Sequence, residues 1–339
     1  MTMRSVVILY NLPAEPAGGQ AAPWRESDEG VLNEVAAVEA ALQELKVPSR
    51  RAGVRRLEDI PAALQADPEA AVFNLVERLD GGVTRFNAVP SVCEALGHPC
   101  TGESSDCLSL TLDKWLTKAR LSAWGVPTPA GAVVPPGAAA DPRALPAPPL
   151  IVKPLRSDGS EGIHTDSVLD DPAANLAAAV RRVHEGHGGQ PALVERYIAG
   201  REFNLSVFAP GGDARVLPLA EIDFSLFPEG RPRIVDYAVK WIPGTIPGRI
   251  SPRQVPANVD EPTARVLRDI ALRAWHACEC RDYVRVDMRV DASGGPHVLE
   301  VNANPDLSPQ AGFPASLAAA GIPFTGFVEQ LLRNAEARR

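Results

Sequence analysis

The sequence of 339 residues lacks any apolar run long enough to cross a membrane. The longest run near its start, Val6-Val7-Ile8-Leu9, falls far short of the roughly 20 residues that a membrane helix requires. A charged segment and a small-residue cleavage site are also missing there, so we predict no signal peptide. We therefore expect a cytoplasmic protein that does not enter a membrane.

Positive charge and paired cysteines are scarce as well. The formal net charge is −8, which disfavours binding to nucleic acid or to an anionic membrane. The five cysteines are odd in number, and no pair of CxxC motifs frames a zinc site. We expect these thiols to stay reduced in a reducing cytosol. An internal repeat with a period of about 20–50 residues is also missing, which argues against a repeat architecture.

Predicted strands and helices alternate over residues 1–108. Residues 5–10 and 71–76 are short apolar runs typical of buried parallel strands. A helix is predicted to begin at Ser27, where Asp28 and Glu29 suit the positive end of the helix dipole. A second helix is predicted over 89–96. This alternation indicates a small Rossmann-like α/β lobe with a parallel sheet.

The rest of the sequence predicts two further lobes, with many of the 33 prolines and 27 glycines in the connectors. The expected helices are 110–124, 171–183, 261–278 and one from residue 325 onward. The expected strands are 131–134 at a sheet edge, 150–153, 162–168 returning antiparallel, 192–198, 202–208, 283–290 and 297–302. The order predicts a mixed α/β and α+β fold. Its lobes are N-terminal (1–108), small central (109–192) and larger C-terminal with an antiparallel sheet (193–339).

The hairpin at 283–302 carries the most informative pattern. Its polar residues alternate with apolar ones, so that Arg285, Asp287, Glu300 and Asn302 share one face, while Leu299 and Val301 face the core. If 292–295 form a four-residue loop, 291 opposes 296, Asp287 opposes Glu300 and Arg285 opposes Asn302. Facing carboxylates cost up to ~1 kcal/mol, and a bound cation removes that cost. Oxygen ligands of this kind suit Mg²⁺, and Mn²⁺ is a second choice.

The competing interpretation of this hairpin is a solvated face on which arginines neutralise the acids. From the pattern alone the two interpretations have equal weight, because alternating charged strands are common.

Three further segments carry weaker signals for phosphate and nucleotide binding. Lys153 ends a strand and precedes a loop in which Gly159, Gly162 and Ser160 point donors into a concavity. A loose hairpin with incidental glycines explains the same residues.

The segment around the turn at residues 199–200 offers backbone groups for an adenine edge and Glu202 for a ribose hydroxyl. Taken by itself, this segment is better explained as two exposed glutamates that flank a turn. Lys114 and Lys240, taken alone, are typical of solvated surface.

The order of these segments resembles the ATP-grasp superfamily and, within it, the D-alanine–D-alanine ligase group. The likeness lies in VFNLVE (72–77), TGESSDCLSLTLDKWLTKARLSAWGVPTP (101–129), IVKPLRSDGSEGI (151–163), LVERYIAGREFNLSVF (193–208), DYAVKW (236–241) and YVRVDMRVDASGGPHVLEVNANPDLSP (283–309). The resemblance implies an ATP- and magnesium-dependent, ADP-forming carboxylate–amine ligase that acts through an acyl phosphate. It also implies small-molecule substrates and a possible homodimer.

The resemblance further assigns roles to particular residues. It implies phosphate contacts by Lys114, Lys153, Gly159, Ser160 and Lys240, with Ser160 in the loop that closes over the phosphates. It implies adenine contacts by Glu195, Tyr197 and Ile198, a ribose contact by Glu202, and metal binding by Asp287, Glu300 and Asn302. It implies that Arg285 stabilises the oxyanion of the tetrahedral intermediate.

Two segments depart from the family pattern and affect the substrate pockets. The loop after the first strand is not the Gly-rich Ser-Ala-Glu type, and Gln310-Ala311-Gly312-Phe313 stands where relatives place a Ser-Leu pair. We therefore expect an amino-acid or dipeptide ligase with other substrates, with Glu77, Arg78 and Arg85 as candidate contacts. The alternatives are a true D-alanine–D-alanine ligase and an ATP-binding protein without ligase activity.

Overall fold

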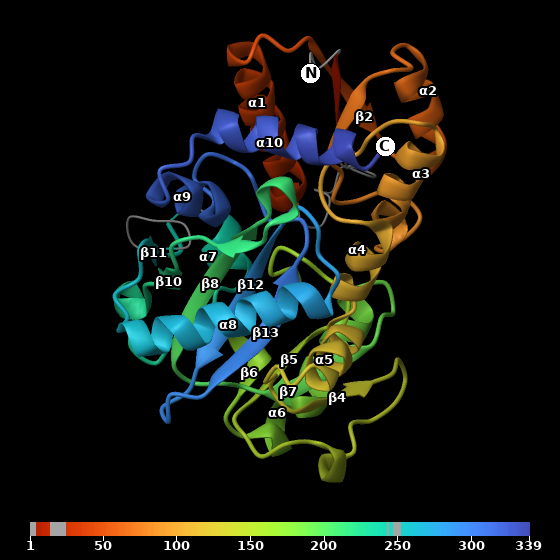
Figure 1. Ribbon diagram of the computed structural model, residues 1–339. Helices are drawn as coiled ribbons and strands as arrows, with labels where there is room; N and C mark the ends of the chain where they lie inside the picture. The colour runs from red at the N-terminus through yellow and green to blue at the C-terminus, as the bar shows by residue number, and fades with distance from the viewer. Residues whose placement is uncertain (1–4, 14–24, 243, 247–251) are drawn as a thin grey trace.

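The computed structural model describes residues 5–13, 25–242, 244–246 and 252–339, and it contains three separate sheets (Figure 1). The three-stranded N-terminal sheet lies at the top of the view, the six-stranded sheet in the middle and the four-stranded sheet at the bottom. Short 3₁₀ turns occur at Leu57–Asp59, Arg85–Ala88, Pro142–Ala144, Thr165–Ser167, Pro210–Gly212 and Phe224–Leu226.

The first sheet is parallel, as predicted, with strand order β2-β1-β3. It comprises β1 (Val6–Asn11), β2 (Ser49–Val54) and β3 (Ala71–Leu75), and α1 (Arg25–Glu44), α2 (Ile60–Gln65) and α3 (Val89–Ala95) accompany it. β2 was not predicted, because its sequence SRRAGV is polar and only two of its six residues are buried. The helix expected to begin at Ser27 already includes Arg25, and the loop expected over 13–23 lies almost wholly outside the described residues.

The helix predicted over 110–124 is two helices, so this prediction is wrong at Asp113. α4 (Ser105–Leu112) and α5 (Lys114–Ala123) meet there, where the Asp113 backbone is extended and its side chain accepts hydrogen bonds from the N–H groups of Trp115 and Leu116. An aspartate that caps a new helix competes with continuation of the old one. The break places Lys114 in the first turn of α5, where it is buried.

The central sheet is antiparallel, with order β4-β7-β5-β6. It comprises β4 (Gly131–Val134), at the edge as predicted, β5 (Leu150–Pro154), β6 (Val168–Leu169) and β7 (Ala192–Arg196). The strand expected over 162–168 is wrong, since only two residues pair there. The helix α6 (Pro172–Gly186) packs on this sheet and forms with it a hydrophobic core distinct from those of the other lobes.

The largest sheet has the order β11-β10-β8-β12-β13, with β9 beside β8. Its strands are β8 (Arg201–Phe208), β9 (Arg215–Val216), β10 (Ala220–Ile222), β11 (Arg253–Gln254), β12 (Tyr283–Val290) and β13 (Pro296–Asn302). The helices of this part are α7 (Tyr237–Trp241), α8 (Glu261–Ala277), α9 (Gly312–Ala319) and α10 (Phe324–Ala337). β7 and β8 belong to different sheets, so the turn at 199–200 links two lobes.

The outer two lobes share hydrophobic cores. Phe73 of β3 belongs to the same buried cluster as Phe313 and Phe327, which make aromatic contacts with Tyr283 of β12. α10 crosses the top of the molecule beside α1 (Figure 1). The central sheet and α6 have a core of their own and are therefore coupled less tightly to the rest of the molecule.

The predicted hairpin forms, with one correction to its register. Arg285 opposes Asn302 and Asp287 opposes Glu300, as expected, but Val290 opposes Pro296 and the register shifts between Asp287 and Met288. The turn therefore has five residues, and Leu299 is the extra residue of a β-bulge. Its predicted direction is wrong: Val298 faces the core, whereas Leu299 lines a cavity.

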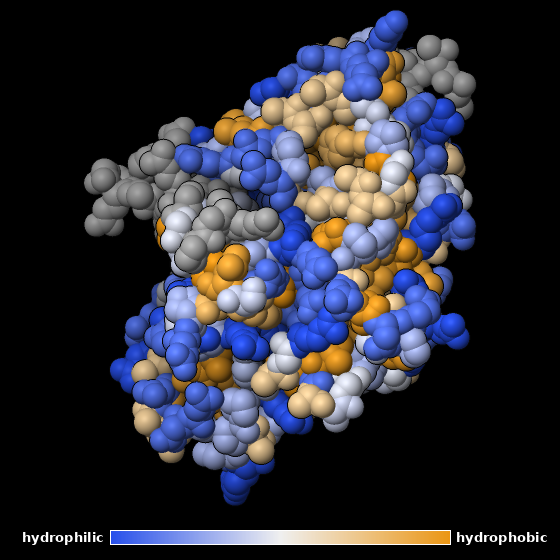
Figure 2. Space-filling view, turned by 90° about the vertical axis from the view of Figure 1, so that its left-hand side faces the viewer, coloured by the Kyte–Doolittle hydropathy of each residue, from blue (hydrophilic) through white to orange (hydrophobic). Residues whose placement is uncertain are grey.

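Within the described ranges, no single helix passes the length and hydropathy test for a membrane span. Only the pair α9 and α10, bent by 105°, passes it jointly. On the face seen in Figure 2, hydrophilic residues alternate with hydrophobic patches.

Candidate active site

A cavity of about 1000 Å³ opens between the central and largest sheets and extends to α1 and α9. Eleven of the predicted site residues line it: Lys153, Gly159, Ser160, Glu195, Tyr197, Ile198, Glu202, Lys240, Arg285, Asp287 and Glu300. The sequence separates the first and last of these by almost half the chain. Such a concave site with convergent polar groups is typical of a ligand-binding site.

The hairpin places an ion pair and a second carboxylate on the cavity wall. Asp287, 7 % exposed, accepts hydrogen bonds from Arg285 Nε and Nη2 at 2.7 and 2.8 Å and from Asn204 Nδ2 at 2.8 Å. Burial raises the pKa of Asp287 to about 6, against the opposing effect of Arg285. The alternative of a solvated face is wrong, because Asp287 is buried against the cavity, but its expected neutralisation by an arginine is present in the Arg285–Asp287 pair.

Glu300 stands opposite Asp287 in the register. Burial opposes its ionisation, but the charges of Lys114, Arg285 and other nearby lysines outweigh burial and lower the pKa of Glu300. In the part of the chain that the structure describes, no cation lies within ion-pair distance of this carboxylate. An ionised carboxylate with open lone pairs facing a second carboxylate fits a divalent cation with oxygen ligands.

Asn302 and Lys114 lie next to the cavity and are not among the residues that line it. The Oδ1 of Asn302 accepts a hydrogen bond from the Asn304 N–H at 2.9 Å, which leaves one lone pair and the amide group. Lys114 Nζ donates to the carbonyl of Ser157 in the glycine-rich loop (residues 155–162). The charge of Lys114 nevertheless lowers the pKa of Glu300.

Two lysines hold Glu195, and one of them, Lys118, was not predicted. Lys153 contacts one oxygen of the Glu195 carboxylate, and Lys118 Nζ lies 2.6 Å from the other. All three side chains are buried. Burial opposes the charge of Glu195, yet the two lysines lower its pKa. The signal for Lys118 was its position four residues after Lys114, which places both on one face of α5.

Glu202 and Arg289 form a buried pair on the same wall. Arg289 donates to Glu202 Oε2 from Nε at 2.9 Å and from Nη2 at 2.7 Å, and its Nη1 donates to the carbonyl of Ile198 at 2.9 Å. The guanidinium also lies 4.9 Å from the centroid of the Tyr197 ring. Arg289 therefore fixes the segment that links the two lobes.

The glycine-rich loop is held against α7. Gly159 and Gly162 adopt positive φ, and so does Ser160 at 62°, which costs a residue with a side chain about 1 kcal/mol. Ser160 Oγ donates to the Val235 carbonyl at 2.8 Å, and Trp241 Nε1 donates to the Gly159 carbonyl at 2.8 Å. Lys240 lines the cavity beside Trp241, with Nζ 5.0 Å from the ring centroid.

The predicted substrate contacts Glu77, Arg78 and Arg85 are not among the residues that line the cavity. Burial raises the pKa of Glu77 to about 8, helped by the negative charge of Asp306, which does line the cavity. Arg78 pairs with Glu161 of the glycine-rich loop.

Glu34 and Arg253 were not predicted from the sequence. Glu34, on α1, is buried and accepts a hydrogen bond from the Leu307 N–H at 2.8 Å. Arg253 lines the cavity, and its Nη1 donates to the Gln310 carbonyl at 2.8 Å.

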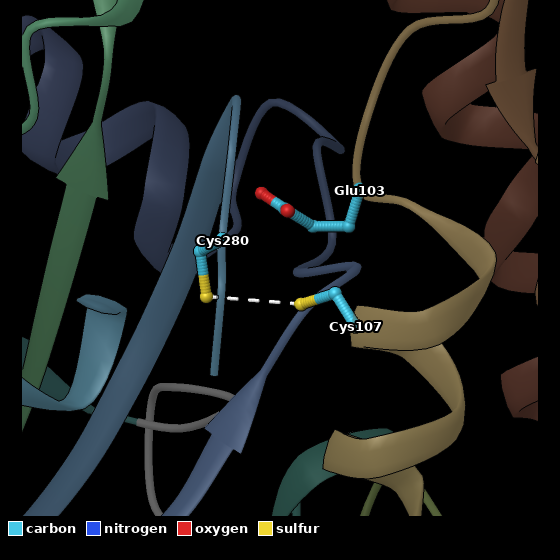
Figure 3. A group of neighbouring side chains, drawn as sticks. All are labelled: Glu103, Cys107 and Cys280. Carbon is cyan, nitrogen blue, oxygen red and sulfur yellow. Dashed lines mark hydrogen bonds between the residues drawn. The ribbon is translucent and has the colours of Figure 1, made fainter. Parts of the chain in front are cut away.

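A second cluster lies outside the cavity, at the junction of α4 with the start of β12 (Figure 3). Cys107 and Cys280 contact each other through sulfur atoms 3.7 Å apart, and burial raises the pKa of the Cys280 thiol. Glu103 accepts hydrogen bonds from the N–H groups of Arg281, Asp282 and Tyr283 at 2.7, 3.0 and 3.1 Å. The Glu103 carboxylate therefore binds backbone N–H groups. The described cysteines are free thiols.

Comparison with known sequences identifies relatives along most of the chain. The sequence model of the family described as "D-ala D-ala ligase C-terminus" matches residues 144–333. The "D-alanine–D-alanine ligase" of Desulforudis audaxviator is 35% identical over 263 residues, which are 77% of this chain and 80% of that protein. The "Uncharacterized protein y4sG" of Sinorhizobium fredii is 34% identical over 268 residues, 79% of this chain and 75% of that one.

Solved structures share the whole fold. The D-alanine–D-alanine ligase from Bacillus anthracis complexed with ATP superimposes with a TM-score of 0.75 at 20% identity, covering 99% of this chain and 98% of that chain. The enzyme from Coxiella burnetii gives 0.71 at 18% identity, covering 99% and 95%.

The two antiparallel sheets that enclose a cavity lined by lysines, a glycine-rich loop and facing carboxylates define an ATP-grasp enzyme. The chain belongs to the D-alanine–D-alanine ligase family. The predicted resemblance, fold class and enzyme class are confirmed: it is an ADP-forming carboxylate–amine ligase that uses ATP and Mg²⁺.

Proposed function

We propose that the protein joins an amino acid or dipeptide carboxylate to the amine of a second amino acid, and that the cavity holds ATP at its Lys153 end. One observation carries this proposal. Asp287 and Glu300 face each other in the same cavity that is lined by Lys153 and by the glycine-rich loop that follows it. Facing carboxylates among several lysines are costly in an empty site and useful around a metal–triphosphate.

The nucleotide roles follow from the residues that line the cavity and from Lys114 beside it. Lys114, Lys153 and Lys240 supply positive charge for the phosphates, and Gly159 and Ser160 supply loop donors. The backbone of Tyr197 and Ile198 offers the adenine contacts, with Glu195 held in place by its two lysines. Glu202, fixed by Arg289, is oriented for the ribose.

Asp287, Glu300 and Asn302 are the residues that would hold Mg²⁺. When bound, Mg²⁺ neutralises phosphate charge during transfer of the γ-phosphoryl group to the substrate carboxylate. Arg285 spends two N–H groups on Asp287 and keeps the others for the oxyanion that forms when the amine attacks the acyl phosphate. The closed glycine-rich loop excludes water from that intermediate.

The end of the cavity beyond Arg285 supplies charges of both signs for an amino-acid substrate. Asp306 and Arg253 line it, together with Ala311 and Gly312. We propose that Arg253 holds a carboxylate of the amine substrate. A second candidate is D-alanine for both substrates, favoured by the naming of the relative from Desulforudis audaxviator.

We further propose cytoplasmic location, a homodimer, and the lobe division 1–108, 109–192 and 193–339. Because β7 pairs with β4 and β5, the second boundary fits better at the turn 199–200.

The test is coupled ADP release with ATP, Mg²⁺ and a panel of D- and L-amino acids and dipeptides. We expect turnover that depends on a carboxylate–amine pair, and Glu300→Gln to abolish it while the fold persists. Glu329→Gln on α10 is the matched control and is expected to be active. Turnover by Glu300→Gln at the wild-type rate contradicts the metal assignment. Strict use of D-alanine selects the second candidate, and ATP binding without turnover on the whole panel refutes the proposal.

A further inference from the structure

We propose that Arg78 is a positioning residue that holds the glycine-rich loop closed against the N-terminal lobe, through its ion pair with Glu161. The inference rests on the proposed role of that loop in covering the acyl phosphate. Arg78 follows β3 in the first lobe, and Glu161 lies at the tip of the loop, 83 residues further along the chain. The contact therefore joins two lobes.

The loop has three sets of attachments, and the Arg78 contact is distinct among them. At the base of the loop, Arg156 bonds through its side chain to Asp113, which caps α5, and through its backbone N–H to Gln190. Lys114 donates to the Ser157 carbonyl in the same region. At the tip, Ser160 and Trp241 tie the loop to the α7 region. Arg78 differs from these residues because it belongs to the N-terminal lobe and forms an ion pair with the loop.

The geometry gives this contact a defined strength. The Glu161 side chain is 10% exposed and the Arg78 side chain 38% exposed, so the pair is partly screened by water. Such a pair is weaker than a buried one and able to open and reform. This is the property required of a contact that must release the loop in every catalytic cycle.

The charges around this contact show in which direction the loss of Arg78 shifts the glycine-rich loop. Glu77 faces the negative charges of Asp158 and Glu161 when the loop is closed, and both raise its pKa. Arg78 supplies positive charge in the same place and stabilises the charged form of Asp158. Removal of Arg78 therefore leaves Asp158 and Glu161 of the loop without the cation that the N-terminal lobe supplies to them, and this loss favours the open loop.

Glu77 connects this contact to the substrate end of the cavity. The charge of Asp306, which lines the cavity, acts on Glu77, and Glu77 is the neighbour of Arg78 in the chain.

The first measurement needs no knowledge of the substrates. Hydrogen exchange of the backbone amides in residues 155–162 is followed with ATP and Mg²⁺ in Arg78→Ala, Arg78→Lys, Glu161→Gln and the exchanged pair Arg78→Glu/Glu161→Arg. We expect roughly fivefold faster exchange in Arg78→Ala and Glu161→Gln, near wild-type protection in Arg78→Lys, and recovery in the exchanged pair. Arg182→Ala is the matched control, since Arg182 pairs with Asp166 at 2.6 Å on the exposed surface.

The second measurement is the ratio of ADP released to amide formed, using the substrate pair found by the panel. The wild type is expected near one ADP per amide, and Arg78→Ala several-fold above it, because an open loop admits water to the acyl phosphate. Equal melting temperatures are expected for wild type and Arg78→Ala.

Wild-type exchange and coupling in Arg78→Ala, or no recovery in the exchanged pair, overturns the inference. Loop protection that depends on Arg78 in a protein without ligation instead overturns the proposed function and leaves the contact supported.

Discussion

Glu103 carries a charge that its surroundings oppose, and this makes the stability of the protein dependent on pH in a calculable way. The side chain is 2% exposed. Burial and the negative charge of Asp282 raise its pKa to about 7, against the lowering effect of the backbone N–H groups that it binds. Those N–H groups belong to Arg281, Asp282 and Tyr283, so Glu103 fixes the start of the strand that carries Arg285 and Asp287.

The magnitude follows from the difference between the folded and the ordinary pKa of this carboxyl. From 4.5 to about 7, at ~1.4 kcal/mol per pH unit, the difference is about 3 kcal/mol. The folded protein binds the proton more tightly than the unfolded chain. Its contribution to stability is therefore full below pH ~4.5 and is lost as the pH rises through about 7.

The assay is urea unfolding of the wild type and Glu103→Gln at several pH values between about 4.5 and 8. The glutamine loses the hydrogen bond from the Arg281 N–H at every pH, which gives a constant offset. The free energy of unfolding of the wild type, minus that of the variant, should fall by about 3 kcal/mol across the range. A difference that stays constant or rises with pH refutes the reasoning.

Two more variants test residues that sequence patterns alone did not reveal. Lys118→Met leaves Glu195 with one lysine and draws Lys153 toward it. We expect the free energy of unfolding in urea to fall by up to about 3 kcal/mol and the KM for ATP to rise. Unchanged values of both contradict the role of Lys118. Arg253→Ala should raise the KM of the amine substrate roughly 10-fold, the equivalent of ~1.4 kcal/mol, without changing the KM for ATP. An equal rise for the carboxamide analogue of that substrate contradicts carboxylate binding by Arg253.

The sequence predicted those parts of the fold in which local pattern and burial agree. β1 and β3 are apolar runs buried between layers, and β12 alternates polar and apolar residues toward the cavity and the core. β2, which is as long as β1, escaped prediction because it carries two arginines and no apolar run. The break at Asp113 escaped it because Leu-Asp-Lys continues the helical pattern, and only capping geometry favours a new start.

The site was predictable where the residues of one motif act together. Asp287 and Glu300 belong to one hairpin, so register arithmetic placed them face to face. Arg78 and Glu161, or Lys118 and Glu195, are 83 and 77 positions apart in the chain. Nothing in local periodicity relates such residues, and only the packing of lobes brings them together.

The bulge at Leu299 is the clearest case of structure that local pattern hides, and it yields a further prediction. Val298 and Val301 are both buried in the core, at 0% and 1% exposure, and residues three apart cannot share a face of a regular strand. The extra residue resolves this conflict, and as a result Leu299 and Glu300 both line the cavity. Deletion of Leu299 restores regular alternation and keeps the Glu300 carboxylate opposite Asp287.

We therefore expect the Leu299 deletion to fold and to keep metal binding, measured with Mn²⁺ by electron paramagnetic resonance. Its affinity for ATP should fall roughly 10-fold or more, because a leucine contact buried against the base contributes about 1.5–3 kcal/mol. Leu299→Ala keeps the bulge and should lose ATP affinity in the same way. If the deletion abolishes Mn²⁺ binding while Leu299→Ala retains it, the bulge itself places Glu300, and the interpretation of Leu299 as an added wall residue is wrong.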